Sequence, residues 1–203
     1  MFDAAILPHL RRVLDTPARM LVARGVAADH VSLAGFGIGL LALPALWLGW
    51  YAVALVLILA NRLADGLDGI VARKTAISDR GAFLDIALDF FFYATVPLGF
   101  VLADPALNAV SGAVLITAFI GTGSSFLAFA VIAAKRGMTS DTYPTKGIFY
   151  LGGLTEGTET ICVFVLMCLF PQWFSALALT FAMACFFTTV LRWLQGWRAF
   201  AHE

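Results

Sequence analysis

The sequence predicts an all-α polytopic membrane protein with six transmembrane helices and a short amphipathic helix at its N-terminus. Of its 203 residues, 61% are hydrophobic and 13% are charged, and the mean hydropathy is +0.91. Soluble domains carry about 25% charged residues, so this composition indicates a chain that lies mostly in lipid. Two further observations support this fold class: apolar runs alternate with short polar breaks, and the basic residues are unevenly shared among those breaks.

The first element is a basic segment at residues 1–30, which lacks the continuous apolar core of a cleavable signal peptide. Apolar residues recur at helical spacing between Ile6 and Leu14, beside Arg11 and Arg12. This pattern predicts a short amphipathic helix at the membrane interface, with its arginines near anionic headgroups. The alternative is a plain cytoplasmic lead-in.

Six apolar runs follow, and each is long enough to cross a hydrocarbon core of about 30 Å. The runs lie near residues 31–49, 51–73, 81–103, 109–134, 147–170 and 172–195. We therefore expect one transmembrane domain at 31–195 and a cytoplasmic tail at 196–203.

The breaks between these runs are of two kinds. Those near residues 50, 104 and 171 contain no Lys or Arg. The other ends of the runs carry most of the basic residues, including Arg73, Lys74, Arg80, Lys135, Arg136, Lys146, Arg192 and Arg198. Because Lys and Arg are enriched on the cytoplasmic side of membrane proteins, both termini are expected in the cytoplasm. Arg62 lies within a run, one turn before Asp65.

Four aspartates stand at the ends of the second and third runs: Asp65, Asp68, Asp85 and Asp89. The first pair is three residues apart and the second pair four, so each pair lies on one face of a helix. Two adjoining helices would gather all four carboxylates on the cytoplasmic side. Like charges repel and are poorly solvated near a bilayer, so a cation must hold them, and oxygen ligands favour Mg²⁺ or another hard divalent ion.

The spacing of these residues resembles the signature of the CDP-alcohol phosphotransferase family, D-x2-D-G-x2-A-R followed after seven or eight residues by G-x3-D-x3-D. All eight fixed positions are present: Asp65, Asp68, Gly69, Ala72, Arg73, Gly81, Asp85 and Asp89. The resemblance implies a homodimeric enzyme of the bacterial inner membrane that transfers a substituted phosphate from a CDP-alcohol to a hydroxyl acceptor and releases CMP. CDP-diacylglycerol is the expected donor, phospholipid biosynthesis is the expected pathway, and no nucleic-acid partner is expected.

The resemblance also implies roles for the motif residues. Asp65, Asp68 and Asp85 would ligate Mg²⁺ or Mn²⁺, with two ions expected. Asp89 would be the general base that receives the acceptor's proton, and it can also contact a metal. The nucleotide and diphosphate would lie against Gly69, Ala72, Arg73 and Gly81.

The fifth run contains Glu156 and Glu159 among several threonines, and their distance in sequence from Lys146 places them well inside that run. Ionisable groups at such depth are costly unless they face a polar cavity. We expect at least one glutamate to line an acceptor pocket, with Lys146 nearby, or to support the metal site. The alternative is that both pair with Arg62 or Arg192 as structural partners.

The identity of the acceptor stays open at this point. A phosphorylated acceptor requires cations, and the candidates are Lys135, Arg136, Lys146 and Arg192. An amino-alcohol acceptor would favour a carboxylate, which Glu156 or Glu159 could supply.

Two other functions also fit parts of the sequence. Asn61, Asp65 and Asp68 have a spacing similar to that of intramembrane prenyltransferases, which bind a diphosphate with Mg²⁺, although a second aspartate-rich motif is missing. A divalent-cation or proton transporter would also contain intramembrane carboxylates. It would carry them at several depths, whereas these aspartates collect on one side.

Overall fold

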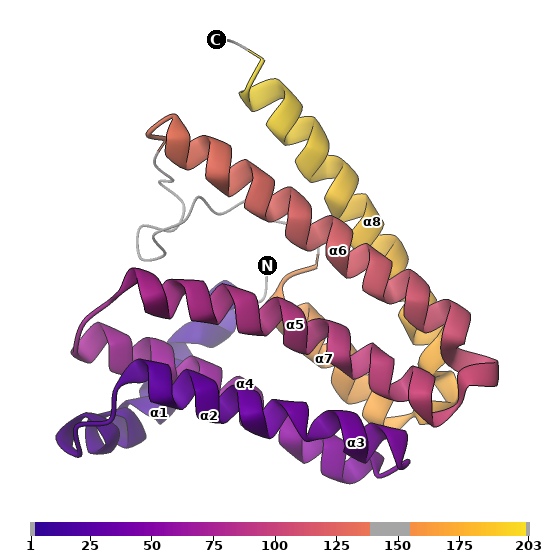
Figure 1. Cartoon of the computed structure of the whole chain (residues 1–203), viewed down its shortest axis with the longest axis horizontal. Helices are drawn as coiled ribbons and strands as arrows, with labels where there is room; N and C mark the ends of the chain where they lie inside the picture. Colours follow the sequence, from indigo (N-terminus) through magenta and orange to yellow (C-terminus); the bar gives the residue numbers. More distant parts are fainter. Residues whose placement is uncertain (1–2, 139–154, 202–203) are drawn as a thin grey trace.

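The computed structural model describes residues 3–138 and 155–201, and every regular element within those ranges is helical (Figure 1). In chain order the elements are α1 (Asp3–Ala23), α2 (Ala28–Leu40), α3 (Ala42–Trp47), α4 (Tyr51–Lys74), α5 (Asp79–Ala103), α6 (Pro105–Lys135), α7 (Gly157–Leu169), the short 3₁₀ turn η1 (Pro171–Trp173) and α8 (Phe174–Ala199).

Within residues 3–138 and 155–201, four segments are long and apolar enough to cross a membrane: Ala28–Trp47, Asp79–Ala103, Pro105–Lys135 and Pro171–Ala199. Helix α4 coincides with the second predicted run, but Arg62, Asp65 and Asp68 lower its hydropathy. Helix α7 is apolar and has 13 residues. The prediction of an all-α polytopic membrane protein is therefore confirmed, while the count of six crossings stays a prediction.

The helices alternate in direction, as the charge pattern predicts. In Figure 1 the turns between α3 and α4, α5 and α6, and α7 and α8 all lie toward the right of the molecule. These are the turns without Lys or Arg. The ends that carry Arg73, Lys74, Arg80 and Lys135 lie toward the opposite side.

Helix α1 has 21 residues and is longer than the short helix predicted from the sequence. Its C-terminal half packs on α4, where Leu14 and Ala18 meet Ile70 and Val71 in a small buried cluster. Lys74 Nζ lies 2.6 Å from Asp15 Oδ1, and this hydrogen-bonded ammonium holds the pKa of the Asp15 carboxyl below its usual range. Packing on α4 explains how the helix extends as far as Ala23.

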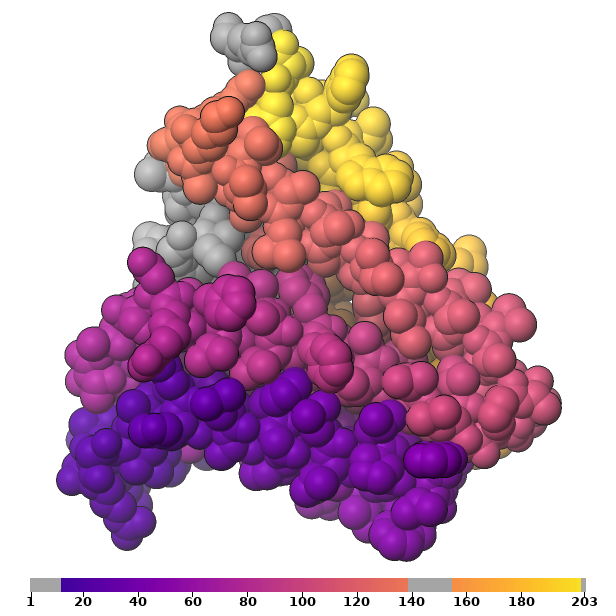
Figure 2. Space-filling view, viewed as in Figure 1, coloured from indigo at the N-terminus to yellow at the C-terminus, as the bar shows by residue number. Residues whose placement is uncertain are grey.

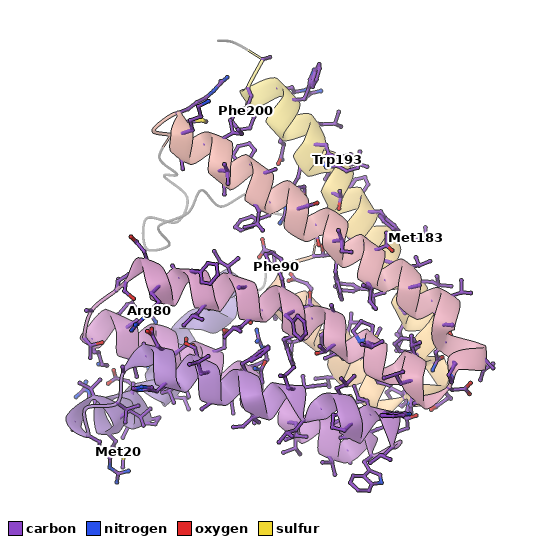
Figure 3. The ribbon with its side chains drawn as sticks, viewed as in Figure 1. Met20, Arg80, Phe90, Met183, Trp193 and Phe200 are labelled. Carbon is purple, nitrogen blue, oxygen red and sulfur yellow. The ribbon has the colours of Figure 1, made fainter. Side chains whose placement is uncertain are left out.

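The main core lies among α3–α8 and combines large aromatic side chains with small alanines. Phe100 of α5 stacks on Phe174 with ring centroids 4.6 Å apart, and Phe92 and Phe164 are fully buried. On the outer face of α8, Met183 and Trp193 point away from the molecule (Figure 3), with 73% and 61% of their surface exposed. Such large exposed apolar side chains suit contact with lipid.

Helix α2 approaches α4 very closely at two glycines. A Cβ atom at Gly35 would lie 2.5 Å from the Cβ of Ala64, and one at Gly39 would lie 2.8 Å from Asn61 Nδ2. Small residues permit this kind of close contact between membrane helices. Helix α2 also packs against α5, so it lies between the two helices that carry the aspartates.

We predict that Gly35→Ala will lower the melting temperature of the detergent-purified protein, whereas Gly37→Ala will not. The added methyl group at residue 35 meets Ala64, whose Cβ cannot rotate away, and overpacking of this kind costs about 1–3 kcal/mol. A Cβ at Gly37 meets nothing within 4 Å, so that variant gains only the helix propensity of alanine. Equal melting temperatures for the two variants would show that α2 and α4 are not in tight contact.

Candidate active site

The four motif aspartates line one small cavity where α2, α4 and α5 meet. Oxygens of Asp65, Asp68 and Asp85 all lie within 4.8 Å of one another. Asp68 is buried, Asp65 is half-buried and Asp85 is exposed. The structure therefore brings together three of the four predicted carboxylates as a cluster, with Asp89 beside them in the same cavity.

Asp89 is held by Arg62, which sits on α4 one turn before Asp65. Arg62 Nη2 donates to Asp89 Oδ1 at 2.6 Å, and Nη1 lies 3.7 Å from Asp65 Oδ2. The other oxygen of Asp89, Oδ2, makes no hydrogen bond within the described part of the chain. Among the described residues that line this cavity, four carboxylates face one guanidinium.

The carboxylate cluster fits a hard divalent ion. Such ions hold oxygen ligands at about 2.0–2.6 Å, so two oxygens on opposite sides of one ion lie up to about 4–5 Å apart. The separation within the cluster of Asp65, Asp68 and Asp85 is of this size, and the three side chains offer only oxygen, the donor that Mg²⁺ and Mn²⁺ prefer.

Helix α2 contributes a side chain that the motif does not contain. Ser32 Oγ donates to Asp68 Oδ2 at 2.5 Å, and this bond orients the most buried carboxylate of the cluster. A hydroxyl in an apolar run is a weak signal, because most such groups bond to their own helix. Ser32 was therefore not predicted from the sequence.

The remaining motif residues surround the link between α4 and α5. A Cβ at Gly69 would meet only the Arg73 guanidinium, at an ordinary 3.5 Å. Gly81 donates its N–H to Ser78 Oγ, the N-cap of α5, at 3.1 Å. Ala72 is half-buried and Arg73 is exposed. Packing does not require glycine at residue 69, in contrast to Gly35 and Gly39 on α2.

A second, larger cavity of about 170 Å³ lies among α5–α8. Figure 2 shows the surface hollowed between α5 and α6, and Figure 3 places Phe90 in this space. The polar and charged residues that line the cavity are Tyr93, Thr122, Thr155, Glu156, Thr160, Cys185 and Arg192. Arg192 is 9% exposed, and its Nη1 donates to the Thr122 carbonyl at 3.0 Å.

The sequence predicted that the two glutamates lie well inside the fifth apolar run. In the structure they lie at the N-terminus of a helix. Glu156 is the N-cap of α7, Glu159 is its third residue, and the two side chains form a capping box. Glu159 Oε2 accepts from the Glu156 N–H at 3.2 Å. Glu156 lines the larger cavity, but Glu159 does not, and Arg62 contacts aspartates instead of either glutamate. Lys146 lies outside the described residues.

Tyr93 connects the two cavities. Its ring lines the larger one, and its hydroxyl accepts from Arg62 Nη1 at 3.2 Å, beside Asp89. Because Tyr93 follows Asp89 by one helical turn, a molecule bound among α5–α8 would lie one turn of α5 from Asp89.

The apolar helices and the carboxylate cluster together define a polytopic membrane protein with a candidate site for a divalent ion. Residues 25–191 match the CDP-alcohol phosphatidyltransferase family. This match covers most of the chain, and the protein therefore belongs to that family. The membership favours the phosphotransferase hypothesis over the prenyltransferase and transporter alternatives.

Three proteins are similar to this chain. Inner membrane protein YnjF of Escherichia coli strain K12 is 54% identical over 197 residues, which are 97% of this chain and 96% of YnjF. Archaetidylinositol phosphate synthase of Pyrococcus horikoshii is 30% identical over 98 residues, 48% of this chain and 52% of that protein. The crystal structure of Mycobacterium tuberculosis phosphatidylinositol phosphate synthase PgsA1 with CDP-DAG bound has a TM-score of 0.74 at 21% identity, covering 92% of this chain and 94% of that one; it shows a shared fold.

We predict that Mg²⁺ or Mn²⁺ will raise the melting temperature of the metal-free protein in a saturable manner. An ion at 100 times its Kd stabilises the folded state by about 2.7 kcal/mol. Asp68→Asn removes a buried charge from the cluster and should abolish most of this shift. Asp79→Asn, at the exposed start of α5, is the matched control and should retain it. A shift that is the same in both variants would place the ion elsewhere.

Proposed function

We propose that this protein transfers a substituted phosphate group from a CDP-alcohol, with CDP-diacylglycerol as the donor, to a small hydroxyl acceptor, and that it releases CMP. The observation that carries the proposal is the oxygen cluster of Asp65, Asp68 and Asp85 with Asp89 beside it, in a chain of the CDP-alcohol phosphatidyltransferase family. The crystal structure of PgsA1 has CDP-DAG bound, which supports a lipid donor of this class. The protein would act in phospholipid biosynthesis in the bacterial inner membrane.

In the proposed reaction, the acceptor oxygen forms a bond to the phosphorus on the lipid side of the donor's diphosphate. The bond between that phosphorus and the oxygen bridging to CMP breaks, and CMP leaves with the bridging oxygen. The acceptor's proton passes to Asp89. Mg²⁺ or Mn²⁺ held by Asp65, Asp68 and Asp85 would neutralise diphosphate charge.

The geometry at Asp89 suits a general base. Arg62 binds Oδ1, whereas Oδ2 has no hydrogen-bond partner in the described ranges and can accept a proton from a bound hydroxyl. Arg62 also fixes the orientation of the carboxylate. A base must lie within hydrogen-bond reach of the proton that it accepts, and a fixed carboxylate meets this condition without rearrangement.

We propose that the nucleotide and diphosphate bind along Gly69, Ala72, Arg73 and Gly81. The spare room at Gly69 supports this proposal. Since packing within the protein tolerates a Cβ there, the absence of a side chain is better explained by close approach of a ligand to the backbone. The exposed Arg73 can then donate to phosphate oxygens through its planar fork.

We propose that the acceptor binds in the larger cavity among α5–α8. Its volume of about 170 Å³ suits a small molecule, and the charged residues that line it in the described part of the chain are Glu156 and Arg192. Arg192 could bind the phosphate of a phosphorylated acceptor, and Glu156 could bind the ammonium group of an amino alcohol. Glu159 would support this pocket through the capping box, and Lys146 is proposed as a further acceptor contact from its position in sequence alone.

We also propose that the protein works as a homodimer with both termini in the cytoplasm. This proposal comes from the family resemblance and from the charge pattern of the turns. Light scattering of the purified protein would measure the oligomeric state, and labelling of cysteines introduced at each terminus, in intact cells, would measure the orientation.

We predict that purified protein will release CMP from CDP-diacylglycerol when supplied with Mg²⁺ or Mn²⁺ and a suitable acceptor from a panel of alcohols and phosphorylated alcohols. Asp89→Asn should reduce the rate by about 10²–10⁴-fold, the usual contribution of a general base, with little change in melting temperature. Absence of CMP release with every acceptor, or an unchanged rate in Asp89→Asn, would contradict the proposed function.

We predict that Arg192→Gln and Glu156→Gln will affect acceptor binding and not donor binding. If the acceptor carries a phosphate, Arg192→Gln should raise its KM at least tenfold while the KM for CDP-diacylglycerol is unchanged. If the acceptor carries an ammonium group, Glu156→Gln should have the larger effect. If only the KM for the donor changed, the result would contradict binding of the acceptor in this cavity.

A further inference from the structure

Tyr93 is a polar residue outside the family motif that reaches both cavities. Its ring lines the larger cavity, and its hydroxyl accepts from Arg62 Nη1 at 3.2 Å. Arg62 in turn donates through Nη2 to Asp89 Oδ1 at 2.6 Å. One guanidinium therefore joins the wall of the larger cavity to the carboxylate that we propose as the general base.

Aromatic side chains of α6 and α7 hold the ring of Tyr93. Its centroid lies 6.3 Å from that of Phe119 on α6 and 6.2 Å from that of Phe164 on α7, and Phe164 is fully buried. Aromatic rings at such separations stabilise each other. Packing against α6 and α7 thus supports the position from which the hydroxyl meets Arg62 on α4.

Asn61 holds another edge of the same guanidinium. Arg62 Nε and Nη2 both donate to Asn61 Oδ1, at 2.9 and 2.7 Å, and Asn61 Nδ2 donates to the Gly35 carbonyl of α2 at 2.9 Å. The guanidinium carbon also lies 5.3 Å from the centre of the Tyr93 ring, which is cation–π distance. Tyr93 and Asn61 bind different nitrogens of one planar group, so both are needed to fix its orientation.

The orientation of this guanidinium decides where the carboxylate of Asp89 points. A general base must lie within hydrogen-bond reach of the proton that it accepts, and small displacements of reacting groups reduce rates strongly. Nη1 lies 3.7 Å from Asp65 Oδ2, which is longer than its bond to the Tyr93 hydroxyl. Without that hydroxyl, Nη1 can turn toward Asp65, and the turn would displace Nη2 from Asp89.

We infer that Tyr93 is a positioning residue for the transfer reaction, because it holds Arg62 in the orientation that presents Asp89 to an acceptor bound among α5–α8. This inference rests on the proposed function for the role of Asp89. Tyr93 acts through Arg62 and exchanges no proton with the acceptor itself. Since its ring also lines the larger cavity, one side chain both shapes the proposed acceptor pocket and aligns the base.

The first test is the kinetics of CMP release by the full-length purified protein, with CDP-diacylglycerol, Mn²⁺ and the acceptor of the panel that gives the highest rate. Tyr93→Phe keeps the ring and removes the hydroxyl. It should lower kcat about tenfold, the usual effect of losing a hydrogen bond to a charged group, and leave the KM values of donor and acceptor unchanged.

A double variant shows whether Tyr93 acts through Arg62. Arg62→Gln should lower kcat more than Tyr93→Phe does, and the addition of Tyr93→Phe to Arg62→Gln should cause no further loss, because residues that act in one chain of contacts are not additive. Tyr51→Phe is the matched control. Tyr51 lies on α4 about three turns before Arg62, and this variant should retain the wild-type kcat.

The second test does not depend on turnover. In protein with isotopically labelled arginine, the Nε–H resonance of Arg62 in a nuclear magnetic resonance spectrum is identified by its loss in Arg62→Lys. Tyr93→Phe should shift this resonance and speed the exchange of its proton with water, whereas Tyr51→Phe should leave both unchanged.

Three results would overturn the inference: a raised acceptor KM with unchanged kcat in Tyr93→Phe, losses that multiply in the double variant, or an unchanged Arg62 resonance in Tyr93→Phe. If Arg62→Gln does not fold, the kinetics and the resonance of Tyr93→Phe decide. The two proposals fail in different ways. Absence of CMP release by the wild type with every acceptor refutes the proposed function, whereas an unchanged resonance in an active protein refutes only the role of Tyr93.

Discussion

Helix α2 lies so close to α4 that the contact requires glycine at two positions. At Gly35 and Gly39 the neighbouring helices occupy the place that a Cβ would take, and Asn61 fills the contact by donating to the Gly35 carbonyl. Arg62 donates hydrogen bonds to Asn61 Oδ1 and to Asp89 Oδ1. Ser32, which is also on α2, donates a hydrogen bond to Asp68 and orients its carboxylate. The geometry of the carboxylates therefore depends on a packing contact between two membrane helices, where burial from water contributes little and close fit contributes most.

The sequence predicted much of this arrangement. Helical spacing and charge identified the aspartate pairs on α4 and α5, because those residues lie close together in the chain and obey local geometry. It did not predict that α2 would complete the site, since hydropathy reveals where helices are but not which of them are neighbours. Arg62 was recognised as unusual from its position in an apolar run, but its partner lies 27 residues away and could not be identified from spacing.

The misplacement of Glu156 and Glu159 has a similar cause. An apolar run indicates that a segment is buried, but it does not state where the helix begins. A capping box at the start of α7 uses both carboxylates to accept from backbone N–H groups. The two residues are therefore far from the start of the apolar run but close to the start of the helix. The sequence also does not reveal what surrounds a glycine. Gly35 and Gly69 look alike in sequence, yet one is required by a neighbouring helix and the other leaves room that a ligand can use.

Helix α5 faces two different surroundings within about two turns. Asp85 and Asp89 line the cavity shared with α2 and α4, whereas Phe90 and Tyr93 line the cavity shared with α6, α7 and α8. If donor and acceptor bind as proposed, the two halves of the reaction are built by separate sets of helices that have only α5 in common. Substitutions in α6–α8 could then redirect the protein to a new headgroup during evolution, while the helices that activate the nucleotide stay unchanged.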